Sequence, residues 1–332
     1  LDALSDYNNK YPDASWITAR GFNEAAWSEA VIPTKDDLDK VSSSKPIYVI
    51  RTCAHIAVSN SLAMQIAGIT KDTVVPPGGE IRLNNDGQPN GIFTETALGL
   101  ITKHIPAPSK AELKTMVRAT REEMYSYGIT AATDPAVHPE LLEAYYEMNA
   151  DGELGFRLNA LPIIIPDGGE KPYPIPEYFS SDFFNVNTVK FFSDGGLSGK
   201  TAALKRFYKS SHEQGVLRLN ADQYESLCRQ SMNKGLAIAT HAIGDAAIEF
   251  VINIYERLHK DFPGISNRIE HLGLPEKKHL QQMADNNIAA SMQTIFLYEL
   301  GKNFIAALDD DYLNQCYPVA SAMQAGIKTA LS

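Results

Sequence analysis

The chain has 332 residues, of which 44% are hydrophobic and 21% charged, and its formal net charge at pH 7 is −10. These values fit a globular protein with one large domain or two smaller ones. The acidic balance argues against nucleic acid or an anionic membrane as the main partner, and no apolar run reaches the roughly 20 residues that a membrane span needs. The cysteines Cys53, Cys228 and Cys316 are far apart, which argues against a disulfide framework or a cysteine zinc site and fits a cytoplasmic protein.

Residues 126–332 alternate short, β-rich apolar runs with amphipathic helical patterns. The runs predict strands at residues 128–134, 156–163, 186–194, 236–241, 267–271, 288–293 and 327–331. Apolar residues at helical spacing predict helices at residues 139–150, 221–234, 246–260 and 277–286. Strands that alternate with helices indicate parallel β/α units, so the series fits either an incomplete (β/α)8 barrel or a doubly wound sheet.

The positions of the polar residues favour the barrel. Polar side chains gather where the short predicted strands end, at Asp134, Lys190, Asp194, His241, Glu270, His271 and Gln293. In barrels, the site is built at these C-terminal strand ends. A doubly wound fold would need a glycine-rich nucleotide loop, and residues 195–201 have neither the dinucleotide-binding nor the P-loop spacing. We therefore predict an α/β, TIM-type barrel.

The first 125 residues follow a different pattern. Strands are predicted near residues 14–18 and 47–53, a short helix at 60–67, a hairpin at 80–87 with its turn at Asp86-Gly87, and an amphipathic helix at 110–125. We expect residues 1–125 to form a mixed α/β insertion beside the mouth of the barrel, which would comprise residues 126–332.

Two histidines end consecutive predicted strands of the barrel. His241 ends one apolar strand and His271 ends the next. Because neighbouring strands lie about 4.8 Å apart, both imidazoles can reach one metal ion, and neutral imidazole is a common ligand of zinc and similar ions. A single strand-end histidine is more often explained by packing or a surface hydrogen bond, but two in succession favour a metal site.

Lys190 lies within an apolar strand, where lysine is unusual unless it is paired. One interpretation pairs its ammonium group with Asp194 or another acid. A second is that its amine has reacted with carbon dioxide to form an anionic carbamate, which can bridge two metal ions. A third makes Lys190 a Schiff-base nucleophile in a metal-free enzyme, which requires a depressed lysine pKa.

Other histidines and acids give weaker signals. His55 follows an apolar strand of the insertion and Glu95 lies in Gly91-Ile-Phe-Thr-Glu95, and each fits a structural or a pocket role equally well. The remaining histidines are predicted to lie in polar loops or on helix surfaces without a role in the site: His104, His138, His212, His259 and His279.

Several motifs in chain order resemble the amidohydrolase superfamily. They are Arg51-Thr-Cys-Ala-His55 with Asn60-Ser-Leu-Ala63, Gly91-Ile-Phe-Thr-Glu95, Val189-Lys-Phe-Phe-Ser-Asp194, Thr240-His-Ala-Ile-Gly-Asp245, Arg268-Ile-Glu-His271 and Met292-Gln293. In combination they are specific, and they cover nearly the whole chain. The resemblance is greatest to the branch called amidohydrolase family 3, which includes N-substituted formamide deformylases and the exoenzyme regulatory protein AepA.

The resemblance implies a (β/α)8 barrel with one or two divalent metal ions, zinc foremost. Lys190 matches the family's carboxylated lysine, and His241 and His271 match its fifth-strand and sixth-strand histidines. The family's first-strand His-x-His, its eighth-strand Asp and its small β-sandwich have no match here. We therefore expect a chain truncated at both ends, without the first barrel strand and the end of the last. His55 and Glu95 would lie near the substrate, with Glu95 as an optional further metal ligand.

These residues imply hydrolysis of a non-peptide C–N bond, in an amide, formamide or cyclic amide. The metal would activate water and polarise the carbonyl group, and His271 and Lys190 would take part in catalysis. Asp194 and Asp245 would orient Lys190 and His241, and the unmatched Asp would be the general base. Because only part of the implied ligand set is present, we expect this chain alone to bind little or no metal and to be inactive.

The expected partner is a small-molecule substrate rather than nucleic acid or a membrane, and a homodimer is left open. The rival hypothesis is a non-catalytic regulatory or binding protein that retains an amidohydrolase fold, because a fold does not determine function.

Overall fold

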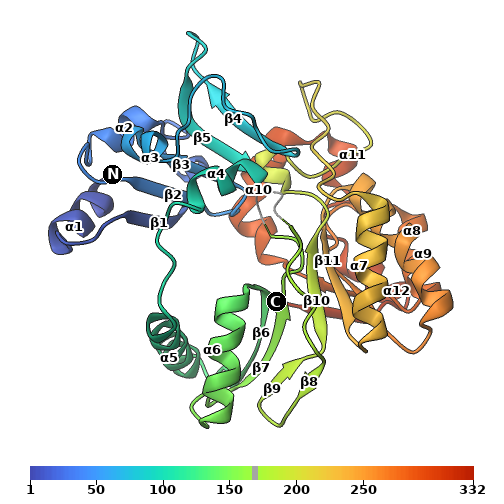
Figure 1. Ribbon diagram of the computed structural model, residues 1–332. Helices are drawn as coiled ribbons and strands as arrows, with labels where there is room; N and C mark the ends of the chain where they lie inside the picture. The colour runs from blue at the N-terminus through green and yellow to red at the C-terminus, as the bar shows by residue number, and fades with distance from the viewer. Residues whose placement is uncertain (167–170) are drawn as a thin grey trace.

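The computed structural model describes residues 1–166 and 171–332 of the chain. Figure 1 shows an N-terminal α/β part, coloured blue to cyan, beside a larger α/β part that runs from green to red. The described strands form three sheets, one in the N-terminal part and two in the larger part. None of the described helices combines the length and the apolar character that a membrane crossing requires.

The N-terminal sheet is mixed. Its strands lie in the order β1 (Ile17–Phe22), β2 (Ile47–Arg51), β3 (Ile56–Ser59), β5 (Pro89–Glu95) and β4 (Gly79–Leu83). β1 and β2 are parallel, and the other neighbours are antiparallel. The predicted hairpin is confirmed as β4–β5, and Gly87 in its turn has φ +76°, which favours glycine. The strand β3 was not predicted.

Short helices and two apolar clusters cover this sheet. The helical segments are α1 (Asp2–Lys10), η1 (Glu24–Ala26), α2 (Lys35–Asp39), α3 (Ser61–Ile66), η2 (Thr96–Leu98) and α4 (Gly99–Thr102). One cluster contains Tyr48 and Phe93, and the other contains Ile17 and Val58. Since side chains alternate along a strand, both faces of the sheet are packed.

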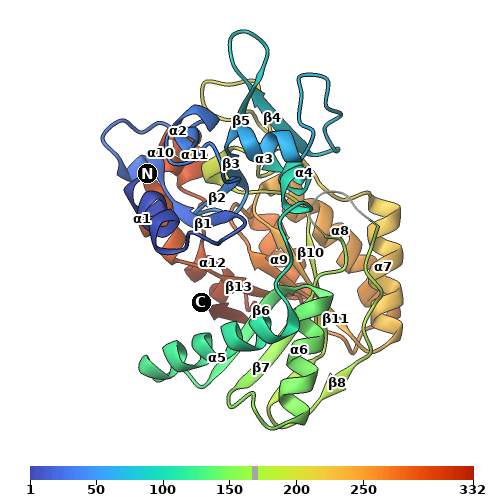
Figure 2. The same ribbon diagram turned by 60° about the vertical axis from the view of Figure 1, so that its left-hand side comes forward.

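The second sheet has the order β6 (Ala131–Val137), β7 (Arg157–Pro162), β9 (Phe184–Val186) and β8 (Phe179–Ser180). It carries the helices α5 (Lys110–Ser126) and α6 (Pro139–Ala150), which lie side by side in Figures 1 and 2. Val117 of α5 shares an apolar cluster with Tyr145 and Met148 of α6. The helix α5 therefore packs against this second sheet.

The third sheet is entirely parallel. Its order is β10 (Thr188–Phe192), β11 (Ala237–Ala242), β12 (Arg268–His271), β13 (Ala289–Met292) and β14 (Thr329–Leu331). The intervening helical segments are η3 (Leu197–Gly199), α7 (Ala221–Asn233), α8 (Asp245–Asp261), α9 (Lys277–Asp285), α10 (Ile295–Ala307), α11 (Asp310–Leu313) and α12 (Val319–Gln324). This sequence of strands and helices confirms the predicted parallel β/α units.

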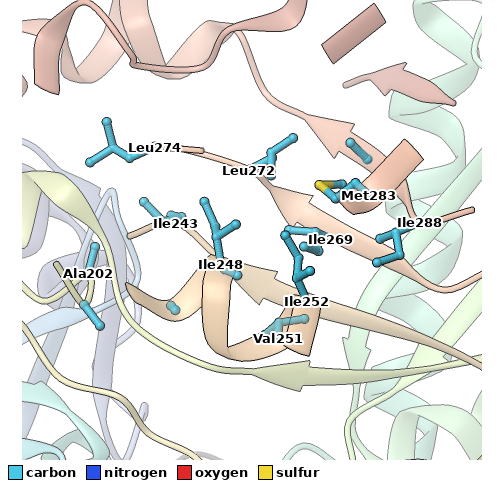
Figure 3. Packing of buried hydrophobic residues seen from close by; sticks show 14 of the residues in the cluster. Ala202, Ile243, Ile248, Val251, Ile252, Ile269, Leu272, Leu274, Met283 and Ile288 are labelled. Carbon is cyan, nitrogen blue, oxygen red and sulfur yellow. The ribbon is translucent and has the colours of Figure 1, made fainter. Parts of the chain in front are cut away.

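The largest apolar core lies between the third sheet and its helices. Figure 3 shows Ile248, Val251 and Ile252 of α8 packed against Ile269 of β12 and Met283 of α9. All five side chains are buried. The face of α8 that its helical spacing predicted is therefore the buried face.

One predicted strand was wrong. The run at residues 186–194 is not one strand but two, β9 and β10, which belong to different sheets. The chain changes partner at Asn187, whose carbonyl oxygen accepts a hydrogen bond from the backbone N–H of Ala237 at 2.9 Å. Apolar periodicity cannot reveal this break, because the residues on both sides of it are buried.

The two sheets of the larger part meet at β7 and β10, where Ile163 and Lys190 form an isolated parallel bridge. At the opposite ends of this series, β6 and β14 each have one neighbour in their sheets. Residues of both strands line a cavity of about 640 Å³. β6 and β14 therefore face one another across a gap.

Candidate metal centre

The structure brings together the three residues that were predicted to face a metal. The ring centroids of His241 in β11 and His271 in β12 lie 4.6 Å apart. Lys190 of β10 places its Nζ 4.7 Å from the centroid of the Phe192 ring, and that ring lies 5.2 Å from the ring of His241. Consecutive parallel strands thus deliver these side chains to one place.

His241 is held by the loop that follows β10. Its Nε2 lies 3.0 Å from the carbonyl oxygen of Gly195, which can only accept, so Nε2 carries the proton and Nδ1 keeps its lone pair. Burial and the neighbouring charges of His55 and Lys190 hold the pKa of His241 well below its usual range. The ring is therefore neutral, as a metal ligand must be.

His271 is held through its other nitrogen. Its Nδ1 lies 2.5 Å from Oε1 of Gln293, so Nδ1 donates and Nε2 keeps its lone pair. Burial, followed by His241 and Lys190, holds its pKa well below the usual range. The backbone is strained here, because His271 has φ +75° and Leu272 has φ +46°. Residues other than glycine rarely adopt such positive φ angles.

Lys190 is buried, with 2% of its surface exposed. Among the described residues its Nζ makes no hydrogen bond or ion pair, so its predicted pairing with Asp194 is wrong. Burial lowers the pKa of Lys190 to about 7, against the opposing effect of the Glu270 carboxylate. A buried lysine without a counter-ion is costly, and this cost favours a functional role over a structural one.

The N-terminal sheet adds His55 and Glu95. The Nδ1 of His55 donates to Oε2 of Glu95 at 3.0 Å, and Nη1 of Arg218 lies 3.6 Å from the same oxygen. Burial lowers the pKa of His55, but Glu95 outweighs this effect and raises it to about 9. Burial raises the pKa of Glu95, but His55 and then Arg218 lower it to about 2. All three groups are therefore charged at neutral pH.

The backbone is also strained on this side of the site. Ala54, which precedes His55, has φ +62°, and Glu95 has φ +49°. The ring of His55 contacts the ring of His241, with centroids 5.4 Å apart. Strained conformations of this kind persist where surrounding contacts enforce them, and they cluster at functional sites.

The two aspartates predicted to orient the metal-facing residues behave differently. Asp194 is fully buried, accepts hydrogen bonds from the backbone N–H groups of Ala203, Ile243 and Gly244, and places Oδ1 3.4 Å from Nε2 of His241. Burial raises its pKa, and these amides oppose the rise. Asp194 therefore contacts His241 but not Lys190.

Asp245 does not reach either of them through a hydrogen bond in the described structure. Its Oδ1 accepts from the backbone N–H of Lys205 at 2.9 Å, and its Oδ2 accepts from the hydroxyl of Tyr312 at 2.9 Å. These contacts tie the start of α8 to the loop that contains Lys205 and to helix α11, which contains Tyr312. Asp245, which was predicted to help orient Lys190 and His241, therefore hydrogen bonds to Lys205 and Tyr312 instead.

Two residues at the site were given no role from the sequence. Gln293 was noted as a strand-end residue, which was a usable signal. Arg218 precedes α7 in a loop and carries no sequence signal for its contact with Glu95. Among the histidines assigned to polar surfaces, His279 is instead fully buried, where its Nδ1 accepts from the backbone N–H of Glu276.

The donor set fits part of a metal site. In residues 1–166 and 171–332, no group of three or more His, Cys, Asp and Glu side chains is arranged to hold a metal ion. What the site offers is two neutral imidazoles, each with one uncommitted lone pair, together with the amine of Lys190. Imidazole nitrogen suits zinc and neighbouring transition metals.

A family model described as "Amidohydrolase family" matches residues 1–332. The Bacillus subtilis protein YtcJ is 27% identical over 336 residues, which cover 99% of this chain and 63% of YtcJ. The N-substituted formamide deformylase of Arthrobacter pascens is 24% identical over 351 residues, which cover 100% of this chain and 63% of the enzyme. This chain therefore matches less than two thirds of the length of either relative.

A solved structure has a similar fold. It is an uncharacterized metal-dependent hydrolase from Pyrococcus furiosus, with a TM-score of 0.73 and 21% identity, and the match covers 100% of this chain and 66% of that chain. The α/β sheets described above fit the fold of these proteins, and the family match extends over the whole sequence. The chain belongs to the amidohydrolase family.

Proposed function

We propose that this chain carries metal-binding residues of a hydrolase that cleaves non-peptide C–N bonds, in an amide, formamide or cyclic amide. Membership of the amidohydrolase family supports a hydrolase. The matched N-substituted formamide deformylase supports the bond type. The substrate would be a small molecule.

The geometry of His241 and His271 is the observation that carries this proposal. Their rings are 4.6 Å apart, and obligate acceptors occupy Nε2 of one ring and Nδ1 of the other. Nδ1 of His241 and Nε2 of His271 each keep a lone pair, and these two nitrogens would hold a divalent metal, most often zinc. Lys190 would be the third ligand, as its amine or as a carbamate.

A divalent metal bound there would supply Lewis-acid activation of the carbonyl group and of the attacking water. The protein's own residues would position the reactants. His55, charged and held by Glu95, would donate a hydrogen bond to the substrate beside His241. Asp194 would keep the ring of His241 in place through the loops that it joins.

We further propose that β6, β7 and β10–β14 are consecutive strands of a (β/α)8 barrel. The bridge between β7 and β10 and the parallel order of β10–β14 support this arrangement. The gap between β6 and β14 would accommodate the remaining strand. Because the described residues offer only two imidazoles and one lysine, residues 1–332 alone would bind zinc weakly.

The test measures zinc content and hydrolysis together. In a longer protein that includes this chain, the wild type and the variants His241→Ala and His271→Ala are stripped with a chelator, reloaded with zinc, dialysed and assayed for zinc per chain. His212→Ala, which removes an exposed histidine, is the matched control. Amine release from a panel of N-substituted formamides and amides is measured in a longer protein that includes this chain.

We expect both site variants to lose zinc and activity, and His212→Ala to retain them. Equal zinc content in all four proteins would overturn the metal site. Zinc bound at His241 and His271 without hydrolysis of any amide would overturn the enzymatic proposal in favour of a binding protein.

A further inference from the structure

Gln293 links His271 by hydrogen bonds to Ser332, which follows the edge strand β14 of the third sheet. Its Oε1 accepts from Nδ1 of His271 at 2.5 Å, and its Nε2 donates to the hydroxyl oxygen of Ser332 at 2.8 Å. It also lies within 3.5 Å of the Ser291 hydroxyl. Gln293 follows β13, and Ser332 follows β14, so the amide links the ends of three neighbouring strands.

The segment that begins with Gln293 holds the imidazole of His271 on two sides. Gln293 binds its edge, and Phe296 stacks on its face with 5.6 Å between ring centroids and 22° between planes. The backbone N–H of Phe296 donates to the carbonyl oxygen of Gln293 at 3.2 Å, which closes this segment into a turn. The position and the plane of the ring are thus both determined by residues 293–296.

The identity of the acceptor determines the tautomer of the ring. In the structure the amide oxygen of Gln293 faces the ring, and because this oxygen can only accept, the proton of a neutral His271 is on Nδ1. An apolar side chain at this position would remove that restraint, and the proton could then occupy either nitrogen. With the proton on Nε2, the lone pair would lie on Nδ1, the nitrogen that faces Gln293.

We propose that Gln293 is a positioning residue that fixes His271 as the Nδ1–H tautomer and so leaves the lone pair on Nε2, the nitrogen that does not face Gln293. The effect of Gln293 on metal binding rests on the proposed function. Its effect on the tautomer of His271 does not, because the hydrogen bond exists in the protein without metal. Partners of metal-ligating histidines typically change metal affinity by about 10-fold to 100-fold when they are replaced.

Two substitutions separate the acceptor from the rest of the side chain. Gln293→Leu removes the acceptor at similar size, whereas Gln293→Glu keeps an acceptor oxygen and removes the donor to Ser332. Gln281→Leu is the matched control, because it makes the same exchange at a glutamine of α9 whose side chain donates to Asp285, away from His271. Thermal unfolding of each variant establishes that it is folded.

The first readout is the tautomer of His271 in the metal-free, full-length chain, from long-range 15N–1H NMR of the imidazole. We expect Nδ1 to carry a proton in the wild type, in Gln293→Glu and in Gln281→Leu, and we expect a mixture or the Nε2–H form in Gln293→Leu. An Nε2–H tautomer in the wild type, or an unchanged tautomer in Gln293→Leu, would overturn the proposal.

The second readout is the zinc dissociation constant, from competition with a chromogenic chelator. We expect it to rise by about 10-fold to 100-fold in Gln293→Leu and to stay near the wild-type value in Gln293→Glu. An equal loss of zinc affinity in both variants would show that the acceptor oxygen at position 293 does not determine zinc binding. If a longer wild-type protein that includes this chain bound no zinc at all, the proposed function would fail, while the tautomer measurement would still decide the role of Gln293.

Discussion

The ring of His55 stands edge-on to the ring of His241, with 5.4 Å between the centroids and 60° between the planes. His55 lies in the turn after β2 of the N-terminal sheet, whereas His241 lies in β11 of the third sheet. Glu95 and Arg218 make a second link of the same kind, through their ion pair at 3.6 Å. The N-terminal part therefore supplies charged side chains directly to the candidate site.

The carboxylate of Glu95 holds this link together, so Glu95→Ala is expected to destabilise the protein. The side chain of Glu95 is 1% exposed and that of His55 is 13% exposed. Removing the carboxylate leaves the buried His55 cation without its acceptor, a change that typically costs about 3–5 kcal/mol of the free energy of unfolding. Urea denaturation followed by circular dichroism measures the loss.

The control for this substitution is Glu147→Ala. Glu147 also pairs with two cations, Lys110 and Lys114, but it does so on an exposed surface, where such pairs contribute little. An unfolding free energy for Glu95→Ala equal to that of the control would contradict the buried ion cluster.

Asp194→Asn tests the carboxylate that ties the loops after β10 and β11. Oδ2 accepts from the N–H groups of Ala203 and Gly244, and Oδ1 accepts from that of Ile243. In the variant, an NH2 group must face at least one of these donors, so we expect a loss of about 1–3 kcal/mol in unfolding free energy. Hydrogen exchange of the three amides should rise in parallel, and unchanged protection would count against the assignment.

Asp245 is expected to affect stability and not metal binding. Its partners are Lys205 and Tyr312, not His241. A double-mutant cycle with Asp245→Ala and Tyr312→Phe should give a coupling energy of about 0.5–1.5 kcal/mol in unfolding. Zinc affinity should be the same in all four proteins, and a selective loss in Asp245→Ala would restore the role in orienting His241 that the sequence predicted.

Lys190 is expected to form a carbamate in the presence of zinc. The amine nitrogen would form a bond to the carbon of carbon dioxide and release a proton, which leaves an anionic carboxylate on the nitrogen. Incubation with 13C-bicarbonate and zinc should give a carbamate carbon signal in the wild type and in Lys209→Arg, an exposed control. The signal should be absent in Lys190→Arg, and its persistence there would show that the label is on another amine.

Local patterns predicted much of the larger part. The apolar face of α8 and the strands β11, β12 and β13 follow from periodicity, and the meeting of His241 with His271 follows from their places at the ends of consecutive strands. These features depend on short segments and on the rule that the C-terminal ends of parallel strands lie at the same edge of a sheet. The burial of Lys190 was predictable for a similar reason, since its neighbours Val189 and Phe191 are fully buried.

The partners of these residues were less predictable, because they come from distant segments. Lys190 could not be distinguished from a paired lysine without knowing that, among the described residues, Glu270 acts on its charge but no acid forms an ion pair with it. Asp245 follows His241 closely in sequence, yet the start of α8 turns its carboxylate toward Tyr312. The break at Asn187 and the burial of His279 likewise depend on which strand or helix packs next to them.

The unpaired edges of β6 and β14 have a consequence for experiments in solution. Each edge has a row of backbone N–H and C=O groups that no other described strand of its sheet covers, and such edges are templates for pairing between molecules. Two molecules that paired through these edges would bury the same backbone groups that a neighbouring strand would cover. Unfolding curves and zinc titrations of this chain therefore describe a single molecule only where they do not change with protein concentration.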